Sequence, residues 1–149
     1  MDKLYTTKSF EETQKLGEDF AIQLCLRQAK ESRKTAVVIG LSGNLGGGKT
    51  TFLQGFAKEL GIKEKILSPT FVVQKRFGNF YHIDCYRLKN YEDILELGWK
   101  EIIKNPKNIV AVEWPEIIKK VLPKNTIFIE FKFIDEQTRE LTIRDKMLT

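Results

Sequence analysis

The sequence predicts an α/β fold in which a mixed sheet, partly parallel and partly built from hairpins, is flanked by helices. One observation is the apolar run at 36–41, typical of a buried parallel strand, which a glycine-rich loop and a helical pattern follow. A second is a pair of short apolar runs, 80–83 and 109–112, each ending at an acidic residue. The third is the partly alternating stretch 126–133 with its partner 140–144, which indicates a hairpin.

Length and composition favour a single domain over residues 1–149, with enough chain for one sizeable core. Of the 149 residues, 42 % are hydrophobic and 30 % are charged, an ordinary globular composition. No apolar run approaches the roughly 20 residues that span a bilayer, and the N-terminus lacks the apolar core of a secretory signal. We therefore expect a cytoplasmic protein with no membrane contact. The net charge of +5 permits an RNA or acidic protein partner without indicating one.

The two cysteines, Cys25 and Cys85, lie far apart, one in a helical pattern and the other in a strand-like stretch. We expect both to be buried reduced thiols, because disulfides are rare in cytosolic proteins. One histidine and the absence of a Cys or His cluster in the sequence argue against a structural zinc site.

The elements follow in order from the N-terminus. Ser9 with Glu12 forms a capping-box pattern, after which apolar residues at every fourth position predict a helix that continues to Leu24. The run at 36–41 predicts a buried strand. Residues 51–60 have helical spacing, and the glycine that follows them supplies a stop.

The second half begins with an extended piece at Ser68-Pro69, because the residue before a proline avoids the helical region. Residues 71–73 and 80–83 read as strands joined by a turn at Gly78-Asn79. A helix is expected over 91–97.

Gly98 is the expected cap of that helix, and the next strand is the apolar run at 109–112. Pro115 then opens a helix through Val121, since proline is favoured at a first helical position. The final hairpin turns around Asp135-Glu136, and the sequence shows no repeat or linker.

The most informative stretch is the glycine-rich loop, which fits the pattern G-x-x-x-x-G-K-[ST]. Its residues are Gly43, Asn44, Leu45, Gly46, Gly47, Gly48, Lys49 and Thr50. Glycines let the backbone wind around a polyphosphate with its N–H groups pointing inward. Lys49 is expected to reach the β- and γ-phosphates, and the Thr50 hydroxyl to take one Mg²⁺ position. Because a strand precedes the loop and a helix follows it, we predict a P-loop NTPase-like domain that binds nucleotide.

Hydrolysis or transfer needs a metal partner and a group that places the attacking oxygen. Ligands in α/β sheets gather at the carboxyl ends of the strands. Asp84 and Glu113 each end an apolar strand, so either could be the acid that holds Mg²⁺, directly or through water. The alternative for each is a helix cap or a turn former.

Four further residues have two interpretations each. Thr70 is placed to approach the γ-phosphate, or else forms a hydroxyl bond in a turn. Arg87 either stabilises the negative charge of the phosphoryl group during transfer or pairs with a surface carboxylate. His82 should share a face with Asp84 and is either a catalytic residue or, as we expect, a half-buried histidine with a satisfied hydrogen bond. Trp114 is either a core residue or an exposed aromatic that contacts a nucleobase or a partner protein.

Taken together, these pieces resemble one family, the bacterial tRNA threonylcarbamoyladenosine biosynthesis ATPases of the TsaE (formerly YjeE) family. The resemblance covers nearly the whole chain. Its landmarks are residues 43–51, Ser68-Pro69-Thr70-Phe71, the stretch from His82 to Leu88, Glu96-Leu97-Gly98 with Glu101, and Glu113-Trp114-Pro115-Glu116.

The resemblance implies roles for particular residues. Lys49 and Thr50 would bind phosphate and Mg²⁺, with Thr51 close by at the nucleotide. Thr70 would be a switch-type threonine near the γ-phosphate, and Asp84 and Glu113 would organise Mg²⁺ and the attacking water. Further positions match the family's signature, and these are Tyr86, Arg87 and Trp114, the last expected beside the metal.

The implied function is that of an ATPase subunit for N6-threonylcarbamoyladenosine at position 37 of tRNA. The transfer would take place on a partner, a threonylcarbamoyl transferase subunit bound to its inactive paralogue. This chain would dock on that heterodimer with ATP, and hydrolysis, weak in isolation, would reset the complex. Contact with tRNA would be indirect or weak.

Three positions depart from the family pattern, which commonly has an acid at Asn44, alanine at Gly47 and leucine at Cys85. Alternatives are a small-molecule kinase, for which no arginine-rich lid is evident, and a module in which the nucleotide is structural, which Asn44 would favour. A GTPase is disfavoured, because the sequence has no Asn-Lys-x-Asp run to read guanine.

Overall fold

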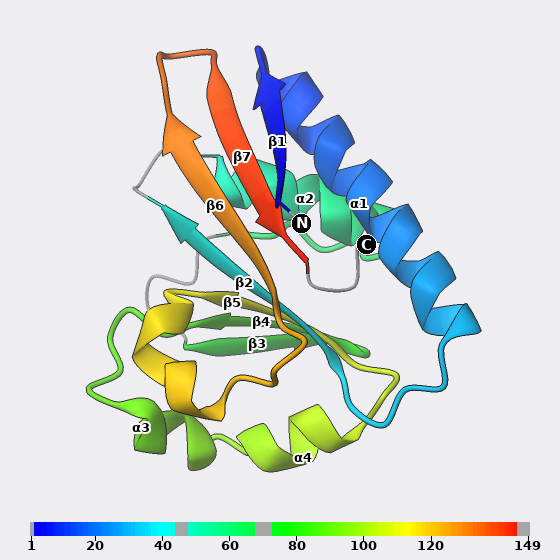
Figure 1. Ribbon diagram of the computed structural model, residues 1–149, viewed down its shortest axis with the longest axis vertical. Helices are drawn as coiled ribbons and strands as arrows, with labels where there is room; N and C mark the ends of the chain where they lie inside the picture. The colour runs from blue at the N-terminus through cyan, green and yellow to red at the C-terminus, as the bar shows by residue number, and fades with distance from the viewer. Residues whose placement is uncertain (1, 44–47, 68–72, 146–149) are drawn as a thin grey trace.

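The computed structural model describes residues 2–43, 48–67 and 73–145 (Figure 1). In these residues one sheet of seven strands has the order β1-β7-β6-β2-β5-β4-β3. The strands are β1 (Asp2–Thr7), β2 (Val37–Gly43), β3 (Gln74–Phe77), β4 (Phe80–Asp84), β5 (Ile109–Glu113), β6 (Ile127–Phe133) and β7 (Arg139–Arg144). The helices are α1 (Phe10–Lys30), α2 (Lys49–Glu59), α3 (Tyr91–Leu95), α4 (Trp99–Lys104) and the 3₁₀ helix η1 (Pro115–Val121).

The sheet is mixed, as the sequence predicts. Its centre is parallel, because β2 pairs in parallel with β5 and β6, and β5 pairs in parallel with β4. Its two ends are antiparallel, through the β3–β4 hairpin on one side and β6–β7–β1 on the other. The carboxyl ends of the four parallel strands therefore meet at one edge, where ligands of α/β sheets bind.

Helices cover both faces of the sheet (Figure 1). The larger core lies under α1 and α2 and contains a cluster of phenylalanines, in which the rings of Phe20 and Phe52 are 5.8 Å apart. Two glycines let the helix backbones touch: a Cβ on Gly17 would lie 2.1 Å from the Phe52 carbonyl oxygen, and one on Gly55 2.0 Å from that of Gln14. Replacing either glycine would push the helices apart. The smaller core on the opposite face lies under α3, α4 and η1.

Several elements differ from the prediction. Strand β1 was not expected, because as a largely exposed edge strand paired with β7 it shows no apolar alternation. The expected helix over 91–97 ends at Leu95, and the unpredicted α4 follows Gly98, whose φ of 84° breaks the helix. Of the strand expected at 71–73, residues 71 and 72 lie outside the described residues and Val73 is not in a strand; the first strand of this hairpin is Gln74–Phe77. The turn at Gly78-Asn79 is confirmed.

The cysteines are free thiols, as expected, but only one of them is buried. Cys85 is fully buried after β4, and burial raises the pKa of its thiol to about 12. The prediction that Cys25 is buried is wrong, since it is exposed on α1 beside the exposed Ile22 and Leu26. The reason is the orientation of the helix: Phe20 and Leu24 of the same turns pack into the core, whereas Cys25 lies on the outward side with Ile22 and Leu26.

Candidate functional site

Two glycines frame the predicted phosphate loop. Gly43 ends β2 with a φ of 133°, and a Cβ there would lie 2.2 Å from the Phe131 carbonyl oxygen. Gly48 precedes α2 with a φ of 99°, a conformation that other residues rarely adopt. Both positions therefore require glycine for backbone reasons. Asn44, Leu45, Gly46 and Gly47 lie outside the described residues.

Lys49 begins α2 and is 7 % exposed, an unusual burial for a lysine. Its Nζ donates a hydrogen bond of 2.9 Å to the Gly43 carbonyl oxygen and lies 3.8 Å from Glu113 Oε1. The same ammonium is 5.4 Å from the centre of the Trp114 ring. The side chain thus reaches back to the end of β2 and holds its positive charge at the carboxyl edge of the sheet. Thr50 and Thr51 follow in the first turn of α2.

Asp84 and Glu113 occupy paired positions at the ends of β4 and β5. Glu113 is buried, at 4 % exposure, and its Oε2 lies 2.7 Å from His82 Nε2. Asp84 is half-buried and accepts a 2.9 Å hydrogen bond from the Tyr86 N–H. Burial raises the pKa of Asp84 and the charge of Glu113 adds to the rise, whereas the Tyr86 N–H, His82 and Lys49 oppose it. Two acids therefore face α2 side by side, balanced by the lysine of the loop.

Trp114 follows Glu113 directly and has a φ of 58°; no other non-glycine residue in the described part of the chain has a positive φ. A residue in this region stores roughly 1–3 kcal/mol of strain, which is typical of functional sites. The turn brings the indole beside Lys49 and against Tyr86, with ring centres 5.1 Å apart. Tyr86 is 63 % exposed, and Arg87 next to it is exposed as well. Thr70 lies outside the described residues.

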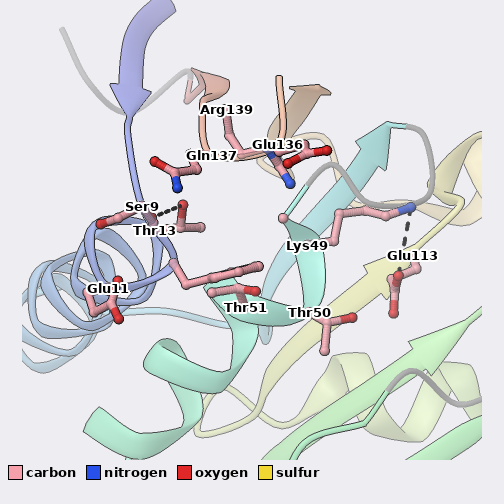
Figure 2. A pocket seen from close by; sticks show the side chains of 12 residues that line it. Ser9, Glu11, Thr13, Lys49, Thr50, Thr51, Glu113, Glu136, Gln137 and Arg139 are labelled. Carbon is pink, nitrogen blue, oxygen red and sulfur yellow. Dashed lines mark hydrogen bonds and ion pairs between the residues drawn. The ribbon is translucent and has the colours of Figure 1, made fainter. Parts of the chain in front are cut away.

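A pocket of about 420 Å³ opens above the start of α2 (Figure 2). Its base is the first turn of α2, and Glu113 lies at the end where Lys49 is found. One wall is the N-terminus of α1 and the other is the loop between β6 and β7. The wall residues are Ser9, Phe10, Glu11, Thr13, Glu136, Gln137 and Arg139.

The sequence analysis missed these wall residues. Arg139 is nearly buried, donates to the carbonyl oxygens of Asp135 and Thr138, and lies 4.6 Å from the Phe133 ring centre. The Asp135 carboxylate accepts the N–H groups of Gln137 and Thr138, which lower its pKa and fix the loop. The one signal available was the capping-box pattern at Ser9, which places the start of α1. The cap by Ser9 is confirmed, since its hydroxyl accepts the Glu12 N–H, but the Glu12 carboxylate accepts the N–H of Lys8 and not that of Ser9.

His82 shares the α2-facing side of the sheet with Asp84, as the alternation in β4 predicts. It is more buried than expected, at 3 % exposure, and its hydrogen bond is satisfied by Glu113. The sequence could not show that the partner would be the acid at the end of the neighbouring strand.

Comparison with known proteins identifies the family. The profile described as "Threonylcarbamoyl adenosine biosynthesis protein TsaE" matches residues 7–141. The chain belongs to the TsaE family. It is a P-loop ATPase-like protein of threonylcarbamoyladenosine biosynthesis, and the resemblance inferred from the sequence motifs is confirmed.

Relatives support this assignment over most of the chain. The TsaE protein of Treponema pallidum is 32 % identical over 130 residues, which cover 78 % of this chain and 96 % of the relative. The TsaE protein of Rickettsia typhi is 34 % identical over 146 residues, which cover 95 % of this chain and 94 % of the relative. The crystal structure of Bacillus subtilis YdiB superimposes with a TM-score of 0.75 at 29 % identity, covering 97 % of this chain and 86 % of that one. The P-loop NTPase-like fold is therefore confirmed.

Proposed function

We propose that this TsaE-family protein is a Mg²⁺-dependent ATPase whose ATP binding and hydrolysis drive assembly and resetting of the complex that modifies tRNA. The observation that carries the proposal is the contact between the lysine of the loop and the buried Glu113 carboxylate, with Asp84 in register beside it. A buried ion pair is weak evidence for a purely stabilising role, so this pair with a second acid beside it favours a functional role.

The pocket supports a definite orientation for ATP. Its volume lies within the roughly 300–1,000 Å³ typical of ligand sites. The phosphates would lie over Gly48, Lys49, Thr50 and Thr51, where the positive end of the α2 dipole meets them. The adenosine would extend between Phe10 on α1 and Gln137 in the β6–β7 loop.

The donor set fits magnesium. In the described part of the chain no three His, Cys, Asp or Glu side chains gather into a metal cage, but Mg²⁺ bound with nucleotide keeps several waters and takes only one or two protein oxygens. The Thr50 hydroxyl and the carboxylates of Asp84 and Glu113 are hard oxygen donors of this kind. When bound, the ion would neutralise charge on the phosphates.

The residues of the chain then have separate tasks. Lys49 would exchange the Gly43 carbonyl for phosphate oxygens, which are stronger acceptors for an ammonium group. One of the two acids would orient the attacking water, and the other would hold the metal through its first hydration layer. Thr70 would contact the γ-phosphate as the switch threonine. Tyr86, Arg87 and Trp114 would border the metal site and report its state to a partner.

The partner would be the heterodimer of the threonylcarbamoyl transferase subunit and its inactive paralogue. Bound ATP would hold this chain in the docking state and hydrolysis would release it, as in other nucleotide switches. The tRNA would be contacted indirectly or weakly, and the complex would work in the cytoplasm. No helix in the described residues is long and apolar enough to cross a membrane.

The test measures ATP hydrolysis by the purified chain alone, with the heterodimer, and with heterodimer and tRNA. We expect slow turnover alone and strong stimulation by the heterodimer, absent in Lys49→Ala. The control is Lys58→Ala on the same helix, because Lys58 is 72 % exposed and pairs with Glu18 away from the pocket. Tight ATP binding with no complex and no stimulation would overturn the proposal.

A further inference from the structure

His82 is the only histidine in the chain, and it is buried against the acid of the candidate site. It lies in β4 opposite Ala111 of β5, so its ring reaches diagonally toward Glu113, two residues further along β5. The distance from His82 Nε2 to Glu113 Oε2 is 2.7 Å. Both side chains are at most 5 % exposed, so water does not compete for this hydrogen bond.

An ionised Glu113 carboxylate can only accept hydrogen bonds, and in that state the hydrogen between the two groups is on Nε2 of His82, which donates it. A hydrogen bond of this length to a carboxylate is of the short, charge-assisted kind. The buried imidazole is therefore a donor with a fixed direction.

The two oxygens of Glu113 consequently have different partners. Oε2 is held by His82, while Oε1 lies 3.8 Å from Lys49 Nζ and belongs to the carboxylate that lines the pocket. Without the histidine, rotation of the carboxylate would exchange the two oxygens. With it, a single oxygen is presented toward the loop.

We propose that His82 is a positioning residue for ATP hydrolysis, which holds the Glu113 carboxylate so that Oε1 faces Lys49 and the bound phosphates. This proposal rests on the proposed ATPase function and deepens it. A histidine that only filled the core would affect stability and leave turnover intact. A positioning residue lowers turnover while ATP still binds.

Two variants separate these roles. His82→Leu fills similar space and removes the donor, whereas His82→Gln restores one, because its Nε2 is four bonds from Cα as in histidine. We expect His82→Leu to lower the heterodimer-stimulated kcat by roughly 10–100-fold, the usual loss when a residue that orients a ligand group is removed. The ATP dissociation constant should change by less than about threefold, and His82→Gln should recover most of the loss. Introduced into Glu113→Gln, His82→Leu should cause no further loss, because the two residues act as a unit.

A second readout does not depend on turnover. Since His82 is the only histidine, the imidazole nitrogen signals of the untagged protein in a ¹⁵N NMR spectrum arise from this ring alone. We expect a slowly exchanging hydrogen on Nε2 at neutral pH, lost in Glu113→Ala. An Nε2 without hydrogen would overturn the assignment of the donor.

The remaining outcomes are also decisive. Unchanged kcat in His82→Leu, or a raised KM with unchanged kcat, would overturn the positioning role while leaving the ATPase function intact. Failure of His82→Gln to exceed His82→Leu would overturn it too. If the wild-type chain hydrolysed no ATP even with the heterodimer, the proposed function would fail and the positioning role with it.

Discussion

The two ends of the pocket are built in different ways. The phosphate end consists of one loop and the ends of adjacent parallel strands, and it contains buried polar groups that contact one another: Lys49, Glu113 and His82. The outer end consists of the start of α1 and the β6–β7 loop, and Phe10 there is 67 % exposed. The comparison teaches that chemistry and recognition are separable here. Variants of the acid at the first end should alter turnover, replacing Lys49 should affect both turnover and phosphate binding, and variants at the second end should alter only the affinity for the adenosine part.

The largest effect is expected for Lys49→Ala. Hydrogen bonds to charged groups contribute about 1.5–3 kcal/mol each, and this lysine is expected to contact two phosphates. ATP affinity should fall by roughly 100-fold, and stimulated hydrolysis should be undetectable. Equilibrium binding of a fluorescent ATP analogue measures the first and phosphate release the second. Lys58→Ala, at an exposed position of α2, should behave as wild type; equal loss in both variants would point to damage of the helix.

The second largest effect is expected for Glu113→Gln, which should lower the rate of hydrolysis and leave ATP binding nearly unchanged. The amide keeps the size of the side chain but removes the charge that would orient water or metal, so stimulated kcat should fall by roughly 100-fold or more. ATP affinity should stay within about threefold, since phosphate binding depends on Lys49 and the loop. Glu116→Gln, at an exposed position three residues later, is the matched control. Normal turnover in Glu113→Gln would leave Asp84 as the functional acid.

The same contrast explains what the sequence could predict. Residues of the phosphate end are local or strand-terminal: a glycine-rich loop, a lysine, and two acids after apolar runs, each recognisable without the fold. The partner of His82 was not predictable, because a diagonal contact depends on the register of β4 with β5. The outer end depends on β1 pairing with β7 and on the crossing of α1 and α2 at two glycines. Such tertiary features leave no periodic pattern in the sequence.

Phe10→Ala tests the outer end and has a moderate expected effect. If the exposed ring stacks on the adenine, its loss should raise KM for ATP by roughly tenfold and leave kcat unchanged, since base–aromatic stacking contributes about 1–3 kcal/mol. Leu4→Ala is the control, because Leu4 is 65 % exposed on β1 and does not line the pocket. Measuring KM for ATP and for inorganic triphosphate sharpens the result: the triphosphate should bind both proteins equally. A fall in kcat instead would mean that the two ends are not separable.

The smallest expected effect is on thermal stability, and it should have opposite signs at the two ends of the pocket. Asp84 represents the phosphate end and Asp135 the outer end. Burial raises the pKa of Asp84 above its ordinary 3.8, so folding favours its protonated form, and its charge costs stability as pH rises above that value. Asp84→Asn, measured with a metal chelator, should therefore raise Tm at pH 7 by roughly 1–3 °C, a small gain because solvent screens a half-exposed charge. The gain should disappear below about pH 4.

Replacing Asp135 should change Tm in the opposite direction, because the N–H groups of Gln137 and Thr138 lower the pKa of this carboxyl group. Its carboxylate stabilises the fold at neutral pH, and this contribution is lost as pH falls from 3.8 through the lowered pKa. Asp135→Asn should therefore lower Tm at pH 7, and the difference from wild type should shrink in acid. Thermal unfolding of both variants across pH 3–7 checks the pair. If both substitutions raised Tm, or neither did, the opposite pKa shifts expected for Asp84 and Asp135 would be contradicted.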